Sequence, residues 1–229
     1  MLTPTEIDAL WLSIKVALWA TAVALPFAIW IAHKMARRDF RGKAIADTLI
    51  HIPLVVPPVV VGYVLLLALA PNTVFGGWLA AIGLSPAFKW QGAAIASGIM
   101  ALPLMIRSIR QAFEAEPPGY ADVAATLGAG AYRRFVRIHL PLALPGILSG
   151  TALGFARAIG EFGATITFAA NIPGLTQTLP LALYTAAQSP GGEATAARLA
   201  FLCLIPALGS LVISEWLSRR ARRRRGLTR

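Results

Sequence analysis

The chain has 229 residues, of which 57% are hydrophobic and 14% are charged. Soluble domains carry roughly a quarter charged residues, so this composition excludes a water-soluble globular protein. A membrane-spanning helix needs about 20 mostly apolar residues, so the chain has room for about five or six of them. We therefore expect a single all-helical, multi-pass transmembrane domain over residues 1–229.

The net charge of +11 is the second feature of the composition, and by itself it could indicate a nucleic-acid partner. Of the 21 lysines and arginines, 17 lie in residues 33–43, 107–137 and 219–229. In the topology below these segments share one side of the membrane, so their charge follows the positive-inside rule. The charge therefore reports orientation, with a periplasmic N-terminus and a cytoplasmic C-terminus, and no nucleic-acid partner is expected.

The first two apolar runs cover about 10–32 and 48–70. The first run follows Glu6 and Asp8 where a signal peptide would carry basic residues, so we interpret it as a retained span. The second contains Pro53, Pro57 and Pro58, which interrupt helical hydrogen bonding. We expect the second span to be kinked or partly broken.

The remaining apolar runs predict spans at about 90–106, 141–161 and 200–217, before a basic tail at 218–229. Residues 71–89 suit an external loop with a short helix near 78–82. Residues 162–192 are uncharged until Glu193 but rich in Pro, Gly, Thr, Asn and Gln, which favours an outer-face or re-entrant gate. A cytoplasmic 107–140 loop and a cytoplasmic tail require an even number of crossings between them. Five spans result, and six are the alternative.

The loop before the fourth span reads QAFEAEPPGYADVAATLGAGAYRRFVRIHLP from Gln111 to Pro141 and has room for two short helices. Gly119 marks a helix start, and Gly128 permits a left-handed stop. A slim helix over 120–127 could enter a groove on a partner. A second helix over 131–139 places arginines near the membrane, and Pro141 then opens the fourth span. A plain solvated loop is the competing interpretation.

The spacing within this loop resembles the EAA motif of ABC importer permeases. Asp122-Val123-Ala124 occupies the EAA position, Gly128 follows after three residues, and Ile-x-Leu-Pro follows after nine more. Asp122 and Val123 replace the usual Glu and Ala. The resemblance implies a MetI-like transmembrane fold with a cytoplasmic coupling helix in segment 119–140, seated in a cleft of an ATPase. Candidate coupling residues are Tyr120, Asp122, Val123, Ala124, Leu127, Gly128 and Ala129.

Catalytic chemistry is not expected in this chain. Its Gly42-Lys43 pair lacks the preceding glycine and the following hydroxyl of a phosphate-binding loop. His33, His51 and His139 are scattered along the sequence, so no metal or catalytic histidine site is expected. We predict a pore-forming subunit without a cofactor of its own, whose ATP and Mg are bound by a separate ATPase.

The sequence from Arg157 to Leu199 resembles the molybdate branch of the same permeases. It reads RAIGEFGATITFAANIPGLTQTLPLALYTAAQSPGGEATAARL. Sulfate permeases share EFGA and TQTLP in outline, whereas the ATITF, NIPG and SPGGE elements favour molybdate. Tungstate, a tetrahedral dianion of nearly equal size, is not separable from molybdate by sequence.

Arg157 and Glu161 are charged residues within a predicted span, four positions apart and so on one helix face. An intramembrane charge is a functional candidate, but a structural pair bracing the helix is the alternative, and Glu161 would repel a dianion. Polar residues nearby could offer hydrogen bonds to an oxyanion in transit. Gate or translocation candidates are Arg157, Glu161, Phe162, Gly163, Thr165, Thr167 and Asn171.

The resemblance implies alternating access in a homodimer of this chain in the bacterial inner membrane. Two cytoplasmic ATPase subunits would drive it, and a periplasmic oxyanion-binding protein would supply molybdate. A self-sufficient secondary carrier is the alternative from another class, but it would tend to show inverted repeats, and none is visible. A membrane-anchored nucleic-acid binder is a third possibility, and its arginine tail lacks interleaved aromatic residues.

Overall fold

The computed structural model describes residues 2–117 and 119–223. These residues form helices and no strand, which confirms the predicted all-helical fold. In chain order the elements are α1 (Pro4–Arg37), α2 (Lys43–Val55), α3 (Pro58–Ala68), α4 (Val74–Ala81), α5 (Trp90–Glu114), α6 (Tyr120–Thr126), α7 (Ala131–Arg134), the π-helix η1 (Phe135–His139), α8 (Leu140–Ile159), α9 (Gly163–Phe168), α10 (Leu179–Ala187) and α11 (Glu193–Arg223).

Within the described residues, four helical stretches are long and apolar enough to span a membrane: α1, α5, α7 to α8, and α11. The bent pair α2 and α3 makes a possible fifth, with an angle of 108° between its two helices. The break falls at Pro57, whose extended ψ of 132° ends the helical path before Pro58 begins α3. The predicted break in the second span is confirmed.

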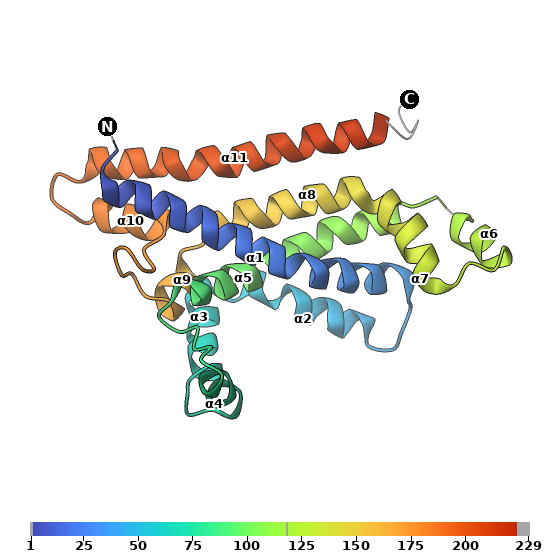
Figure 1. Ribbon diagram of the computed structural model, residues 1–229, viewed down its shortest axis with the longest axis horizontal. Helices are drawn as coiled ribbons and strands as arrows, with labels where there is room; N and C mark the ends of the chain where they lie inside the picture. Colours follow the sequence, from blue (N-terminus) through green and yellow to red (C-terminus); the bar gives the residue numbers. More distant parts are fainter. Residues whose placement is uncertain (1, 118, 224–229) are drawn as a thin grey trace.

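The long helices form a bundle with α5 between α1 and α8, and α11 packs on the outer side of α8 (Figure 1). Small residues allow this close packing. Gly146, Gly150 and Gly154 follow one stripe of α8, and a Cβ added at Gly146 would lie 2.2 Å from the Ala112 Cβ of α5. On the other side of α5, the backbone at Ala20 of α1 lies 3.3 Å from a Cβ added at Gly98.

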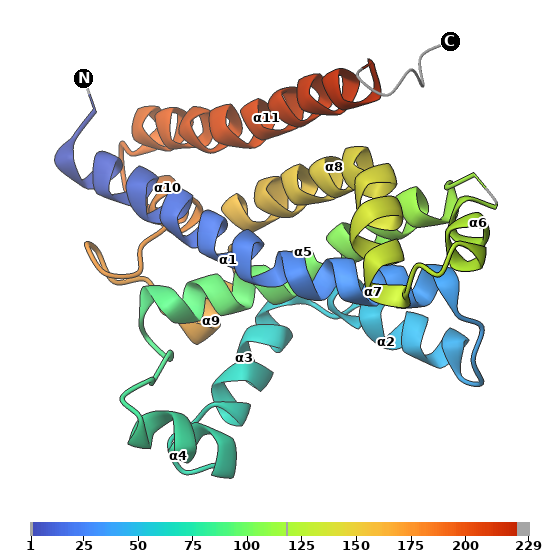
Figure 2. The same ribbon diagram turned by 45° about the vertical axis from the view of Figure 1, so that its right-hand side comes forward.

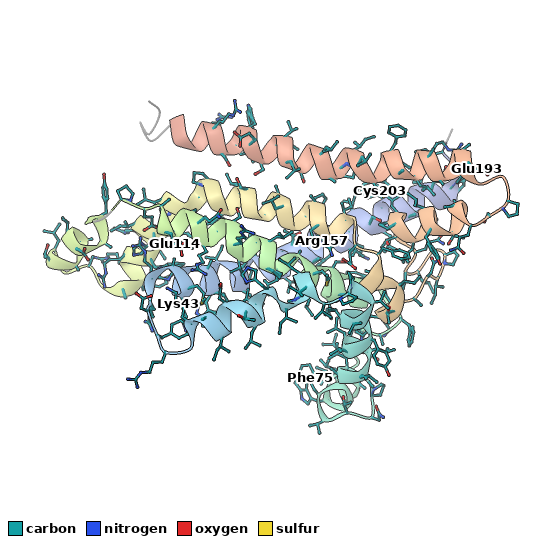
Figure 3. All side chains as sticks on the ribbon, turned by 180° about the vertical axis from the view of Figure 1, so that it is seen from behind. Lys43, Phe75, Glu114, Arg157, Glu193 and Cys203 are labelled. Atoms are coloured by element: carbon teal, nitrogen blue, oxygen red, sulfur yellow. The ribbon has the colours of Figure 1, made fainter. Side chains whose placement is uncertain are left out.

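The helix directions give the number of passes along the bundle. The start of α1 lies at one end, and α6 lies at the opposite end together with the α1–α2 connection (Figures 1 and 2). Seen from behind, Lys43 and Glu114 lie at the α6 end and Glu193 at the other (Figure 3). Helix α2 runs back from the α6 end before the bend, so we count the α2–α3 pair as one pass. With that count the described chain makes five passes, and without it four.

Helices α3 and α4 form an arm that projects from the bundle, with Phe75 near its tip (Figure 3). The predicted short helix at 78–82 is present as the longer α4, whose first turn is capped by the Thr73 hydroxyl, 3.0 Å from the backbone N–H of Gly76. The arm meets the bundle at α9. A Cβ at Gly62 would lie 2.6 Å from the carbonyl oxygen of Ala164, so only glycine fits this crossing.

Two boundary predictions are wrong. The fourth span was expected to run past Gly160, but α8 ends at Ile159, and Glu161 lies outside the helix. Pro141 was expected to open a new helix, yet α7, η1 and α8 are continuous. The π turn, in which the Leu140 N–H bonds the Phe135 carbonyl, widens the helix just before the proline, where a narrower turn would crowd its ring.

Candidate functional site

The first candidate site is α6 at the tip of the bundle (Figure 2). It follows Gly119, whose φ is +93°, and stops at Gly128, whose φ is +79°. The stop is a Schellman motif, because the Gly128 N–H bonds the Ala125 carbonyl and the Ala129 N–H bonds the Ala124 carbonyl. The predicted helix at 120–127 and its glycine stop are confirmed, with α6 ending one residue earlier.

The surface of α6 is apolar and unprotected. None of its seven residues is buried. Tyr120 and Val123 lie at positions i and i+3 on one face of α6, and Leu127 at i+7, the residue after its last turn, continues the row; they are 61%, 61% and 82% exposed. An isolated helix this short is marginal in water, and exposed apolar clusters mark interaction sites. The geometry therefore suits a surface that is completed by a partner.

Asp122 and Ala124 are the remaining coupling candidates on α6. Asp122 is exposed and lies in the first turn, where its negative charge interacts favourably with the positive end of the helix dipole. Ala124 is half-buried and accepts the Schellman hydrogen bond. These positions agree with the expected docking geometry, and their contacts with an ATPase stay a prediction.

The second candidate site is the turn between α8 and α9. The Arg157 guanidinium lies 2.5 Å from the Glu161 carboxylate, and the Glu161 side chain is 1% exposed. The other carboxylate oxygen accepts a hydrogen bond of 2.8 Å from the backbone N–H of Ala164. Glu161 therefore pairs with Arg157 and caps the start of α9. The pairing is confirmed, and the geometry favours the bracing interpretation of the two charges.

The other gate candidates gather around α9. The Thr165 hydroxyl lies 2.8 Å from the Phe162 carbonyl, and the Thr167 hydroxyl lies 3.0 Å from the Gly163 carbonyl, so both protons are donated within the segment. The Phe162 ring packs on Tyr184, with ring centroids 5.0 Å apart. Gly163 faces α3, where an added Cβ would meet Pro58 at 2.8 Å.

Asn171 lies in the loop between α9 and α10. Its amide nitrogen donates to the Thr185 hydroxyl at 2.9 Å, and its oxygen accepts from Gln177 at 3.0 Å. The preceding Ala170 has a φ of +64°, which costs free energy for a residue with a side chain. The loop is thus held in one shape by polar contacts within it and with α10. Contact between the gate candidates and a substrate stays a prediction.

Two of the three histidines, which are far apart in the sequence, meet in the fold. The rings of His33 and His139 lie 5.2 Å apart, at the α6 end of the bundle. Arg37 and Glu116 join them. Sequence analysis missed this group because its members come from α1, from the loop after α5 and from η1, and no local pattern connects segments so far apart.

An ion pair with a buried carboxylate was also missed, at the opposite end. The Arg198 guanidinium of α11 lies 3.1 Å from the Glu6 carboxylate of α1, whose side chain is 4% exposed. On the same side of α1, the Ser13 hydroxyl accepts a 2.6 Å hydrogen bond from the Leu179 N–H of α10. These contacts fasten α10 and α11 to α1. Glu6 had been interpreted only as an acidic residue preceding the first span.

Comparison with known proteins gives a family match over residues 24–223, to the binding-protein-dependent transport system inner membrane component. The molybdenum transport system permease protein ModB of Escherichia coli (strain K12) is 50% identical over 230 residues, covering 99% of both chains. The sulfate transport system permease protein CysW of the same organism is 34% identical over 215 residues, covering 93% of this chain and 74% of the relative.

A solved structure has the same fold. It is a crystal structure of a bacterial ABC transporter involved in the import of the acidic polysaccharide alginate, and it matches with a TM-score of 0.73 at 17% sequence identity. The likeness covers 96% of this chain and 80% of that one. The helical arrangement in Figure 1 is therefore an ABC importer transmembrane fold.

Proposed function

The chain belongs to the family of binding-protein-dependent transport system inner membrane components, and from that premise we propose that it is the permease subunit of an ATP-driven molybdate importer. Membership of this family makes it a multi-pass inner-membrane protein. Family membership also argues against the two alternatives, a self-sufficient secondary carrier and a membrane-anchored nucleic-acid binder.

The exposed apolar face of α6 is the main structural evidence for an ATPase partner. Tyr120, Val123 and Leu127 leave a row of large side chains in contact with solvent at the tip of the bundle. Docking into a groove of a cytoplasmic ATPase would bury this row, and Gly128 sets the path by which the chain leaves the groove. The α6 end of the bundle is then cytoplasmic, and the start of α1 is periplasmic.

The substrate is proposed from sequence likeness. The molybdenum relative shares more of the sequence than the sulfate relative does, and it matches over nearly its whole length. The 157–199 segment, which includes α9 and α10, lies at the proposed periplasmic end (Figure 1). A periplasmic binding protein would release the oxyanion there, and a homodimer of this chain would enclose the path by alternating access, driven by two ATPase subunits.

Docking is tested by co-purification of the chain with a candidate ATPase. Val123→Asp places a charge in the centre of the exposed row, and we expect about a ten-fold or greater loss of association because that charge would be buried without a partner. Val136→Asp in η1, where the side chain is 38% exposed, is the matched control outside the row. Equal association of both variants with the ATPase would contradict docking through α6.

The substrate is tested by uptake of labelled molybdate into vesicles that contain the chain, the ATPase and the binding protein. We expect uptake to require ATP and to persist in excess sulfate, while excess tungstate competes. If sulfate competed as strongly as unlabelled molybdate, the chain would instead be assigned to the sulfate permeases. Uptake without any ATPase would contradict the importer proposal altogether.

A further inference from the structure

One carboxylate holds both ends of the segment that contains α6. Glu116 lies two residues after α5 and His139 ends η1, so the two residues bracket residues 117–138. The His139 Nδ1 lies 2.7 Å from a Glu116 carboxylate oxygen. The same oxygen forms an ion pair with Arg37 in the last turn of α1, and the Arg37 guanidinium also lies 3.2 Å from His139 Nδ1. We call Arg37, Glu116 and His139 the base cluster.

The base cluster is enclosed. The side chains of Glu116 and His139 are 2% and 11% exposed, whereas that of Arg37 reaches the surface at 35%. The ring of His33 covers the cluster, with its centroid 4.8 Å from that of Phe135 and 5.2 Å from that of His139. A buried carboxylate is stable only while its partners stay in place, so the three charged or polar side chains should move together.

Little else connects α6 to the bundle. Among the described helices, α6 makes its main contacts with α7 and η1. Between the start of α6 and the facing sides of α5 and α8 lies a cavity of about 480 Å³, lined among others by Glu116, Tyr120 and Gly146. Side chains do not fill this space, so a displacement of α6 reaches the long helices chiefly through the two ends of its segment.

We propose that the base cluster transmits the movement of α6 to α1 and α5, and that Arg37, Glu116 and His139 are positioning residues for transport. The inference rests on the proposed function. Covalent continuity already joins the segment to α5 and α8, and Arg37 adds an ionic connection to α1 beside the ring contacts of His33. When an ATPase displaces α6, the cluster makes the cytoplasmic ends of α1 and α5 follow as one unit. Without it, ATP is hydrolysed while the helices follow incompletely.

The test measures molybdate taken up per ATP hydrolysed, in vesicles with the complete importer. Glu116→Gln keeps the shape of the side chain and removes its charge. Glu114→Gln is the matched control, because Glu114 is a half-exposed carboxylate that pairs with Arg110 on the same helix end. We expect Glu116→Gln to bind the ATPase and hydrolyse ATP, with uptake per ATP lowered about 5-fold or more. Glu114→Gln should keep the wild-type ratio.

A second pair of variants tests the proposal if Glu116→Gln does not accumulate in the membrane. Arg37→Gln removes the partner from α1, and Arg38→Gln removes the same charge from the adjacent residue, which is exposed. We expect uptake per ATP to fall for Arg37→Gln alone and to recover in Arg37→Lys, since lysine can also pair with the carboxylate. A merely structural role would lower the amount of folded protein without changing this ratio.

The outcomes separate the two proposals. Equal ratios for Arg37→Gln and Arg38→Gln would overturn the role of the base cluster, and so would a loss of ATPase association in Arg37→Gln. A wild-type chain that neither binds the ATPase nor takes up molybdate would instead overturn the proposed function. A lowered ratio confined to the base-cluster variants, with wild-type association, would support the inference.

Discussion

Gly128 has a backbone conformation that a residue with a Cβ adopts at a cost of about 1 kcal/mol. Its φ is +79°, while an added Cβ would meet no atom within 4 Å, so the cost is conformational and not steric. We expect Gly128→Ala to loosen the end of α6 and weaken ATPase association about 5-fold, as about 1 kcal/mol implies. Titration of the purified chain with the ATPase would measure this change.

Gly130→Ala is the matched control for that substitution. Gly130 has a φ of −62° and equally open surroundings, so alanine fits there without strain. The thermal unfolding midpoint of the bundle should be the same in both variants, because neither residue packs against a spanning helix. An ATPase affinity for Gly130→Ala as low as that for Gly128→Ala would mean that the Schellman stop is irrelevant to docking.

The Arg157–Glu161 pair gives a second prediction at the residue scale. Arg157→Leu leaves a buried carboxylate without its positive partner, and we expect a loss of about 3 kcal/mol in the free energy of unfolding. Adding Glu161→Gln should recover part of this loss, because glutamine still accepts the Ala164 N–H and carries no charge. Unfolding of the single and double variants in detergent would measure the coupling. Additive effects would contradict a bracing pair.

Interactions between residues that are neighbours in the sequence were the most predictable. The i, i+4 spacing predicted the Arg157–Glu161 pair, and glycine spacing predicted the ends of α6. The Glu6–Arg198 pair and the base cluster were missed, because they join residues that only the packed bundle brings together. Hydrophobic periodicity and local turn chemistry carry no information about such contacts.

At the scale of elements, proline identified the break between α2 and α3, because it removes a helical hydrogen bond wherever it occurs. The direction of α3 after the break was not predictable. It depends on α9, which accepts α3 only because Gly62 and Gly163 bring the two backbones close together. The π turn at η1 was likewise missed, since Pro141 was interpreted as a helix start and not as the residue that the wider turn accommodates.

Gly62→Ala tests the contact between α3 and α9. The new Cβ would lie 2.6 Å from the Ala164 carbonyl oxygen and 2.9 Å from the Ala164 Cα, and backbone atoms cannot move aside as a flexible side chain would. We expect the free energy of unfolding to fall by about 1–3 kcal/mol, the usual cost of overpacking. Gly209→Ala in α11, where no atom lies within 4 Å, should leave the thermal midpoint unchanged. Equal midpoints for the two variants would contradict the close crossing.

At the scale of the whole molecule, the start of α1 and the end of α11 lie at opposite ends of the bundle, as a count of five passes requires (Figure 1). The count depends on α2 and α3, because a pair bent by 108° can be one broken span or a re-entrant loop. We count the pair as a span because of its neighbours. Helix α2 begins at the α6 end, whereas the Phe88 N–H just before α5 bonds the Phe168 carbonyl of α9 at the other end.

With five passes, we expect a membrane-impermeant maleimide to reach only the loops at the α9 end from outside the cell. Cys203 is the sole cysteine, so Cys203→Ser provides a background without thiols. We expect exposed positions at the α9 end, Asn72→Cys and Ser189→Cys, to react in intact spheroplasts. Exposed positions at the α6 end, Asp39→Cys and Ala125→Cys, should react only after permeabilisation.

The same labelling distinguishes the alternatives. If α2 and α3 formed a re-entrant loop, Asn72→Cys would share the protection of Asp39→Cys, and the chain after α3 would need another crossing to reach α5. If Asp39→Cys reacted from outside and Ser189→Cys were protected, the chain would have the opposite orientation in the membrane. In that case α6 would face the periplasm, no cytoplasmic ATPase could reach its apolar row, and the base cluster would have no movement to transmit.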